Sequence, residues 1–215
     1  MPRVDDYNMA LDITERELRK QNPVHVCRLS GALFTEKEGE PALIRLRFLN
    51  RMISITWPHL LFSQDSNKEL PIKERIIILH YLNGVNRKDL AGEWIAYQDI
   101  PSARFYLDAF NRRVKYPLVS AFGEQPENLL LFAEKLYGAT TVSIGDVSVL
   151  IQALPKIPVT LTIWKGDEEF SPDGAILFDS SIQDILSAED ISELASMIVY
   201  PLLVKVRKCK LSAEQ

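Results

Sequence analysis

The chain has 215 residues, of which 47% are hydrophobic and 25% charged, with a formal net charge of −4 and a pI near 5.5. This composition is close to the average for soluble globular proteins and indicates a folded chain. Because nucleic-acid binding usually depends on a strongly basic face, the acidic balance argues against a nucleic acid as partner.

The cysteine count and the N-terminal sequence narrow the class of protein further. Cys27 and Cys209 are far apart and belong to no Cys-x-x-Cys pair or Cys/His cluster, so we expect no iron–sulfur cluster or structural zinc from this chain alone. No secretory signal opens the chain, and no apolar run approaches the roughly 20 residues of a membrane span. The sequence predicts a reduced, soluble, cytoplasmic protein that does not enter the membrane.

The first forty residues carry mixed signals. Alternating charges in residues 5–20 favour a surface helix. Residues 23–34 fit either a strand or a short helix, because a β-branched start is followed by a helical spacing of Cys27, Gly31 and Phe34. Residues 36–41 read as a charged loop.

Strict alternation of apolar and polar residues over 42–49 and again over 53–57 predicts a β-hairpin with one wet face, ended by Pro58. A polar loop follows at 63–69. The run from Pro71 to Gly84 is apolar almost all round, which predicts a buried helix.

Weaker elements follow. Residues 94–100 predict a short strand, and Ser102 is a candidate N-cap for a helix that runs through Arg113 until Pro117 interrupts it. A helix over 126–138 is well marked, with proline first, glycine last and apolar residues at helical spacing.

The C-terminal third repeats the hairpin pattern. Residues 147–153 and 157–164 alternate as a second hairpin, and Ser187 to Asp190 has the form of a capping box, so the last helix begins near Ala188. Pro201 kinks or stops this helix, and the stretch after it is a strand, a helical tail or a disordered basic end.

Together these elements predict an α+β fold. We expect a single domain with two antiparallel hairpins, in one sheet or in two, packed by about five helices. It divides into an N-terminal helical or irregular segment (1–41), a core (42–200) and a basic tail (201–215). Since both hairpins end in tryptophan, Trp57 and Trp164, an internal duplication is an alternative origin.

The stretch most like a functional site is the acidic loop 167–173 after the second hairpin. Asp167, Glu168 and Glu169, with Asp179 at the end of the next apolar segment, offer oxygen ligands of the kind that Mg²⁺ or Ca²⁺ prefers. The alternative is a solvated hairpin loop whose charges protect a sheet edge. Phe170, an aromatic among polar neighbours, is expected to pack back on the body and fix the loop.

Other candidate ligand-binding residues each have an ordinary structural alternative. His80 is a base or ligand in a pocket, or a core histidine bonded to backbone. Glu93 and Trp94 line a small-molecule pocket, or belong to a sheet edge. Arg112 and Arg113 bind an anion, or one faces solvent while the other pairs with an acid.

None of the familiar catalytic or nucleotide-binding motifs occurs in the chain. Several other strings stand out instead: LHYL (79–82), GEWI (92–95), WKGDEEF (164–170), ILFD (176–179) and the pair Glu189-Asp190. They resemble the uncharacterised family catalogued as domain of unknown function 3786, from about Ala42 to Leu194.

The resemblance implies a setting rather than a reaction. Members of that family occur mainly in anaerobic bacteria and archaea, and some are fused to a cysteine-rich iron–sulfur segment, which this chain lacks. It implies a non-catalytic binding or accessory protein of anaerobic redox or one-carbon metabolism, with a protein partner or a small-molecule ligand. The alternatives are a metal-assisted enzyme that uses loop 167–173 and a structural subunit of a larger complex.

Overall fold

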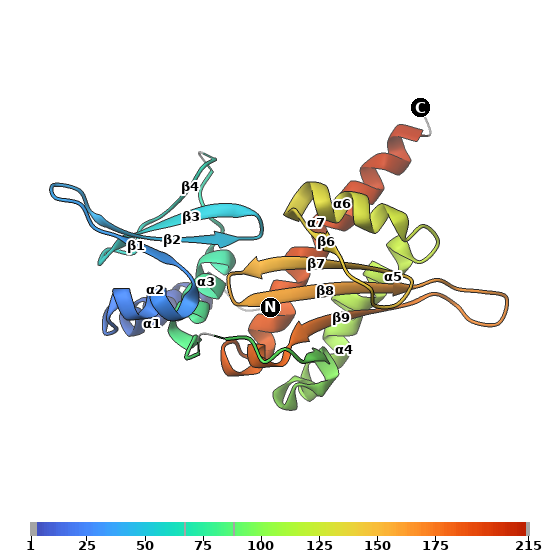
Figure 1. The fold of residues 1–215 in the computed structure, drawn as a ribbon, viewed down its shortest axis with the longest axis horizontal. Helices are drawn as coiled ribbons and strands as arrows, with labels where there is room; N and C mark the ends of the chain where they lie inside the picture. The colour runs from blue at the N-terminus through green and yellow to red at the C-terminus, as the bar shows by residue number, and fades with distance from the viewer. Residues whose placement is uncertain (1–3, 67, 88, 214–215) are drawn as a thin grey trace. The chain divides into compact units, whose positions relative to one another are not determined.

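A computed structural model describes residues 4–66, 68–87 and 89–213. It confirms the α+β class: helices accompany two antiparallel sheets, one of four strands and one of five (Figure 1). The two predicted hairpins lie in different sheets, so the one-sheet alternative is wrong. The ends of the predicted N-terminal segment and basic tail, 1–3 and 214–215, and positions 67 and 88 of the predicted loops, lie outside the described residues.

Contacts divide the chain into two compact units. Unit 1 holds the described residues up to Leu90 together with Leu154–Lys156 and Asp184–Leu186. Unit 2 holds Ala91–Ala153, Ile157–Gln183 and the described residues from Ser187 onward. The single-domain organisation stays a prediction, since the fold class alone does not decide it.

The sheet of unit 1 grows from the predicted first hairpin. Its central turn consists of Leu49 and Asn50, both with positive φ (45° and 66°), as in the two-residue turns that match strand twist. Three-residue strands, too short to show a period in the sequence, flank the hairpin. The strand order is β1 (Leu33–Thr35), β2 (Ala42–Phe48), β3 (Arg51–Trp57) and β4 (Phe62–Gln64).

The helices of unit 1 are α1 (Val4–Arg19), α2 (Pro23–Ser30) and α3 (Ile72–Gly84). The ambiguous segment 23–34 therefore begins as a helix. The Asn22 side chain accepts the N–H groups of Val24 and His25, and Gly31 ends α2 in the left-handed conformation. The predicted helix 71–84 is confirmed.

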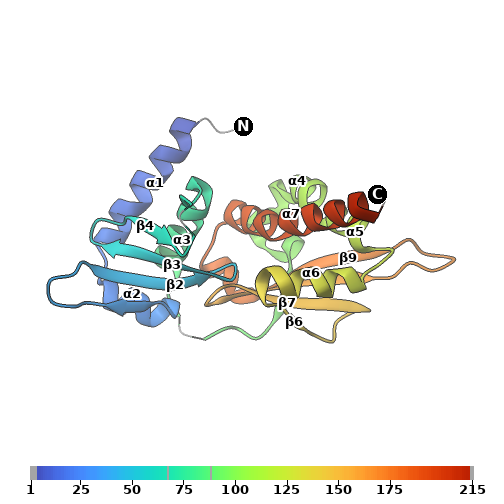
Figure 2. The ribbon, with the colours of Figure 1, turned by 90° about the horizontal axis from the view of Figure 1, so that it is seen from above.

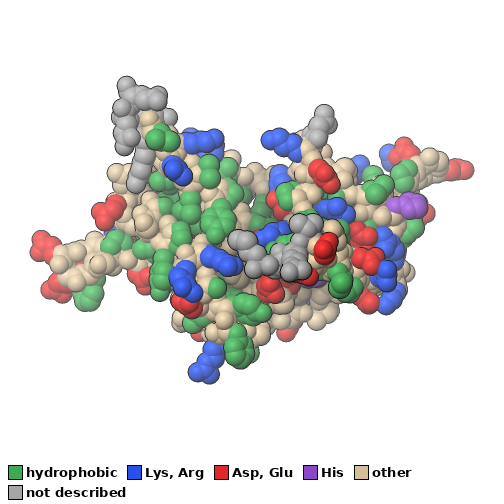
Figure 3. Space-filling view, turned by 180° about the vertical axis from the view of Figure 1, so that it is seen from behind, with side chains coloured by type: hydrophobic (Ala, Val, Ile, Leu, Met, Phe, Trp, Pro, Cys, Tyr) green, Lys and Arg blue, Asp and Glu red, His purple; other side chains and the backbone are tan. Residues whose placement is uncertain are grey.

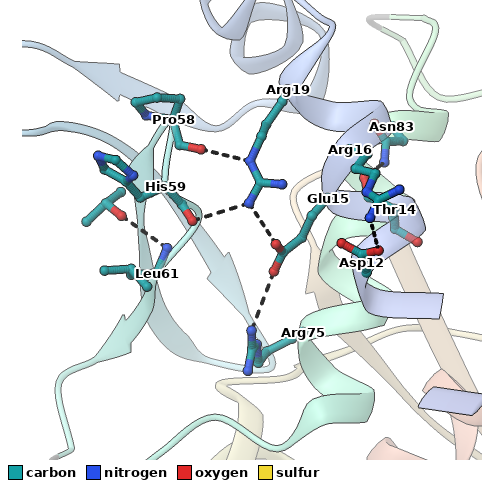
Figure 4. Close-up of polar contacts among 11 residues, drawn as sticks. Asp12, Thr14, Glu15, Arg16, Arg19, Pro58, His59, Leu61, Arg75 and Asn83 are labelled. Carbon is teal, nitrogen blue, oxygen red and sulfur yellow. Dashed lines mark hydrogen bonds and ion pairs between the residues drawn. The ribbon is translucent and has the colours of Figure 1, made fainter. Parts of the chain in front are cut away.

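Polar contacts fix the end of α1 inside unit 1 (Figure 4). Arg19 Nε donates to the carbonyl of Pro58 at 3.1 Å, and its guanidinium pairs with Glu15 at 2.8 Å. Glu15 also pairs with Arg75 of α3 at 3.5 Å. One carboxylate thus connects two arginines from two helices.

The sheet of unit 2 contains the predicted second hairpin. Its order is β5 (Trp94–Ala96), β9 (Asp173–Asp179), β8 (Ile157–Trp164), β7 (Val147–Leu154) and β6 (Thr140–Thr141). The predicted strand 94–100 is shorter than expected, because a 3₁₀ turn takes over at Tyr97. β8 is buried along its length except at Trp164.

The helices of unit 2 are α4 (Leu107–Phe110), α5 (Tyr116–Phe122), α6 (Glu127–Tyr137) and α7 (Ala188–Ala213). Figure 2 shows α4, α5 and α7 on one side of the sheet. The capping box at the start of α7 is confirmed, since Ser187 Oγ accepts the Asp190 N–H at 3.1 Å and the Asp190 carboxylate accepts the Ser187 N–H.

The predictions for Ser102 and Pro117 are wrong in this unit, and one of the two alternatives for Pro201, that it stops the last helix, is excluded. The predicted Ser102 cap is absent, because a 3₁₀ turn begins at Pro101, and Pro117 lies in the first turn of α5 after a π-turn at 111–115. The backbone stays helical from Leu107 through Phe122, so Pro117 directly follows the π-turn within one continuous helical run. Pro201 does not stop α7, and Leu202 directly after it is fully buried, which offsets the lost bond. The described part of the tail, up to Ala213, is therefore helical.

Candidate functional site

The acidic loop connects β8 and β9 at residues 165–172 and projects from unit 2 (Figure 1). Asp167 shapes its tip: its Oδ1 accepts the N–H of Phe170 at 2.7 Å and of Glu169 at 2.8 Å, while its own N–H donates to the Phe170 carbonyl at 2.9 Å. The two N–H donors, Phe170 first, lower the pKa of Asp167. This carboxylate holds the loop in a closed turn.

The base of the loop is fixed to the rest of unit 2. The Lys165 N–H donates to Asp146 at 2.8 Å, and its ammonium bonds Glu127 of α6 at 2.6 Å, which raises the pKa of Lys165 and lowers that of Glu127. Gly123 packs closely on Pro172, since a Cβ at position 123 would lie 2.6 Å from the proline Cβ. Only glycine fits there without moving the loop.

The loop encloses a polar cavity of about 390 Å³, lined by residues 165–172 with Gly123 and Glu124. Acidic side chains gather at this projecting tip, seen on the left in Figure 3. Phe170 is 69% exposed. The prediction that it packs back on the body is wrong: the bonds of Asp167 give the loop its shape, so the ring is not needed as an anchor.

Asp179 lies at the other end of β9 and is only 5% exposed. Its carboxylate accepts the N–H groups of Gly92 (2.7 Å), Ala91 (2.9 Å) and Ser181 (3.1 Å), and the Ser181 hydroxyl. Burial by itself raises the pKa of Asp179, but the hydrogen bonds of Ser181, Ala91 and Gly92 together outweigh it and lower the pKa. The residue fixes the start of β5 against β9.

The predicted metal ligands therefore do not converge. Asp179 is separated from the loop by the length of β9, roughly 20 Å at the usual rise of a strand. Within the described residues, no three Asp, Glu, His or Cys side chains form a group able to hold a metal ion. A cation bound by Asp167, Glu168 and Glu169 of the loop stays a prediction.

The predicted ligand-binding residues also separate. Trp94 pairs with Asp179 in the sheet, so the exposed Glu93 and Trp94 lie at the end of β9 away from the loop. Arg112 and Arg113 are exposed on the π-turn, where Arg112 pairs with Asp108 one turn earlier. His80 is half-buried on α3, in unit 1.

Sequence reasoning missed a second cavity in unit 2, of about 490 Å³, formed by α5, α6 and the end of α7. Its apolar lining includes Leu131, Phe132 and Val206, and Cys209 lies at its wall. These residues come from separate helices, so no local spacing in the sequence points to them.

A scan against family models matches the chain to domain of unknown function 3786 over residues 22–200. The chain belongs to this family. The DUF3786 match spans elements of both units and contains the loop, Asp179 and its partners Ala91 and Gly92. The end of α7 lies beyond it.

Comparison of this DUF3786 chain with curated proteins and with solved structures finds no match. Among its described residues, no helix is both long enough and apolar enough to cross a bilayer.

Proposed function

We propose that this protein is a non-catalytic accessory protein that binds a partner protein through the β8–β9 loop. One observation carries the proposal: Phe170 is 69% exposed at the tip of a loop whose shape Asp167 fixes. A large aromatic side chain presented on a rigid support loses little conformational entropy on binding, and such residues often dominate interfaces.

The roles of the carboxylates support binding over reaction. Asp167 and Asp179, two of the four residues predicted to hold a metal, accept several hydrogen bonds each from backbone N–H groups. Those bonds stabilise the charged form and shape the chain, whereas a general acid or base needs a pKa near the working pH.

The proposed setting is the cytoplasm of an anaerobe, in redox or one-carbon metabolism. It rests on the resemblance to family members fused to cysteine-rich iron–sulfur segments. Since Cys27 and Cys209 are too few for a cluster, any cluster in this setting belongs to the partner.

A photo-cross-linking amino acid at position 170 tests the proposal in the native cell. The same group at position 105 is the control, since Phe105 is 93% exposed in the same unit. We expect one reproducible covalent adduct from position 170 and none from position 105. Equal capture at both positions, or turnover of a panel of small metabolites by the purified protein, overturns the proposal. A stable complex that survives Phe170→Ala points to the structural-subunit alternative.

A metal-assisted enzyme is the second candidate. One observation favours it: Glu124, Asp167, Glu168 and Glu169 line the same cavity. Calorimetry with Mg²⁺, Mn²⁺ and Ca²⁺ at millimolar concentration tests it, with Glu168→Gln/Glu169→Gln as the matched variant. Cation binding that the natural protein shows and this variant lacks supports a metal site in the loop. Identical heat signals from the natural protein and the variant reject it.

A further inference from the structure

The end of α7 presents an apolar stripe away from its own unit. The C-terminal end of α7 extends beyond α6 (Figure 1). Tyr200, Val204 and Leu211 are 47%, 52% and 56% exposed. With Arg207, they recur at steps of four, three and four residues, which places them within roughly 60° of one another around the helix.

The opposite side of the same segment faces its own unit, although Cys209 on that side is exposed. Val206 and Cys209 line the 490 Å³ cavity shared with α5 and α6, and Leu202 is fully buried. Val206 and Cys209 lie roughly 130° to 170° around the helix from the centre of the stripe. The exposed stripe therefore has no cover within the described part of unit 2.

The spacing and width of the stripe select one kind of occupant. Steps of four and three are the pattern of a coiled-coil seam, which a single partner helix covers. A helix that lies in a lipid surface needs a broader apolar face than a stripe roughly 60° wide provides.

Charge selects the partner further. From Leu194 to Ala213 the chain has no carboxylate, while Arg207 lies in the stripe and Lys208 lies roughly 70° around the helix from its centre. A second copy would bring like charges together along the seam, which is destabilising. An acidic helix makes favourable pairs there.

We propose that the stripe Tyr200–Val204–Arg207–Leu211 binds an amphipathic helix of a partner protein whose apolar seam is flanked by Asp or Glu. This surface is distinct from the β8–β9 loop and adds a second point of contact.

The test uses the full chain and a fluorescent heptad-repeat peptide with Leu at both seam positions and Glu on both flanks. A peptide with Lys on the flanks is the charge control. We expect the Glu peptide to bind in an anisotropy titration and to weaken as salt rises, while the Lys peptide does not bind. Equal binding of both peptides overturns the proposal.

Variants locate the contact. Val204→Glu, and separately Arg207→Glu, should each weaken binding of the Glu peptide about tenfold or more. Leu61→Glu, at an exposed apolar position of unit 1, should leave it unchanged. Circular dichroism verifies folding. Unchanged affinity in both stripe variants contradicts the proposal.

Two further outcomes also decide against it. If the protein self-associates and Val204→Glu abolishes this, the stripe binds a second copy of the chain. If the protein co-sediments with phosphatidylserine vesicles and the same change abolishes this, the stripe binds a lipid surface. Phe170→Ala should not alter peptide binding, so failure of this surface and failure of the loop are told apart.

Discussion

The carboxylate of Asp179 accepts the N–H of Gly92 at 2.7 Å, across 87 positions of the chain. The same side chain accepts the N–H of Ala91, and the N–H of Ser180 donates to the carbonyl of Glu93 at 2.8 Å. These bonds fix the stretch that enters β5 against the end of β9. Asp179, the last residue of the ILFD string that resembles the family, therefore has a structural role.

Asp179→Asn should destabilise the fold by about 2–4 kcal/mol at neutral pH, because an amide cannot replace a carboxylate that accepts three N–H groups. Urea unfolding measures the change. Asp108→Asn, at an exposed ion pair with Arg112, is the matched control and should cost less than about 1 kcal/mol. A similar loss in both variants contradicts this role.

The same residue predicts a pH dependence. The pKa of Asp179 is lowered in the folded protein. Its contribution to the free energy of unfolding is therefore fully present above the ordinary aspartate pKa of about 4 and is lost as pH falls through the folded pKa. The stability difference between the natural protein and Asp179→Asn should therefore shrink in acid. A difference that stays constant from neutral pH into strong acid contradicts the assignment.

Gly84→Ala should destabilise unit 1, although alanine is the better helix former. A Cβ at position 84 would overlap the backbone carbonyl of Ile185, which cannot rotate away as a side chain does. We expect a loss of about 2 kcal/mol or more in urea unfolding. Gly39→Ala, where no atom lies within 4 Å, should cost about 1 kcal/mol through its positive φ alone.

Asp167→Ala should loosen the tip of the β8–β9 loop without unfolding the protein. Hydrogen exchange at the N–H groups of Glu169 and Phe170 should speed up, since both lose their acceptor. Glu168→Ala should leave exchange at these two amides unchanged. Equal exchange in the two variants would show that Asp167 does not fix the loop.

The two thiols should react at very different rates. Cys209 is exposed, whereas Cys27 is buried and its pKa is raised by burial to about 11. At mildly alkaline pH a disulfide reagent should modify one thiol rapidly and the second only after denaturation. In Cys209→Ser the rapid phase should vanish, and its persistence would contradict the burial of Cys27.

Local patterns predicted the parts of the fold that local physics determines. The hairpin at 42–57 alternates because one face of its sheet is buried, and helix 126–138 ends where Gly138 adopts the left-handed conformation. The strands at 33–35 and 62–64 were missed because three residues show no period. Their positions depend on partners in the sheet.

The candidate site was harder to predict for the same reason. The charge of the loop was visible in the sequence, but the partners of Asp179 come from residues 87 and 88 positions earlier. Nor does spacing show that Phe170 points outward, since that depends on backbone bonds within the turn. The sequence alone therefore predicts the position of the loop, but not the role of each carboxylate.

Because the two units alternate along the chain, parts of unit 1 are synthesised at different times. The chain passes between them five times, after Leu90, Ala153, Lys156, Gln183 and Leu186. The first 90 residues are therefore synthesised before the remaining residues of unit 1. The carbonyl of Ile185, which packs on Gly84, is made roughly 5–20 s later at ordinary rates of translation. The packing of unit 1 is therefore completed only when a late part of the chain has been made.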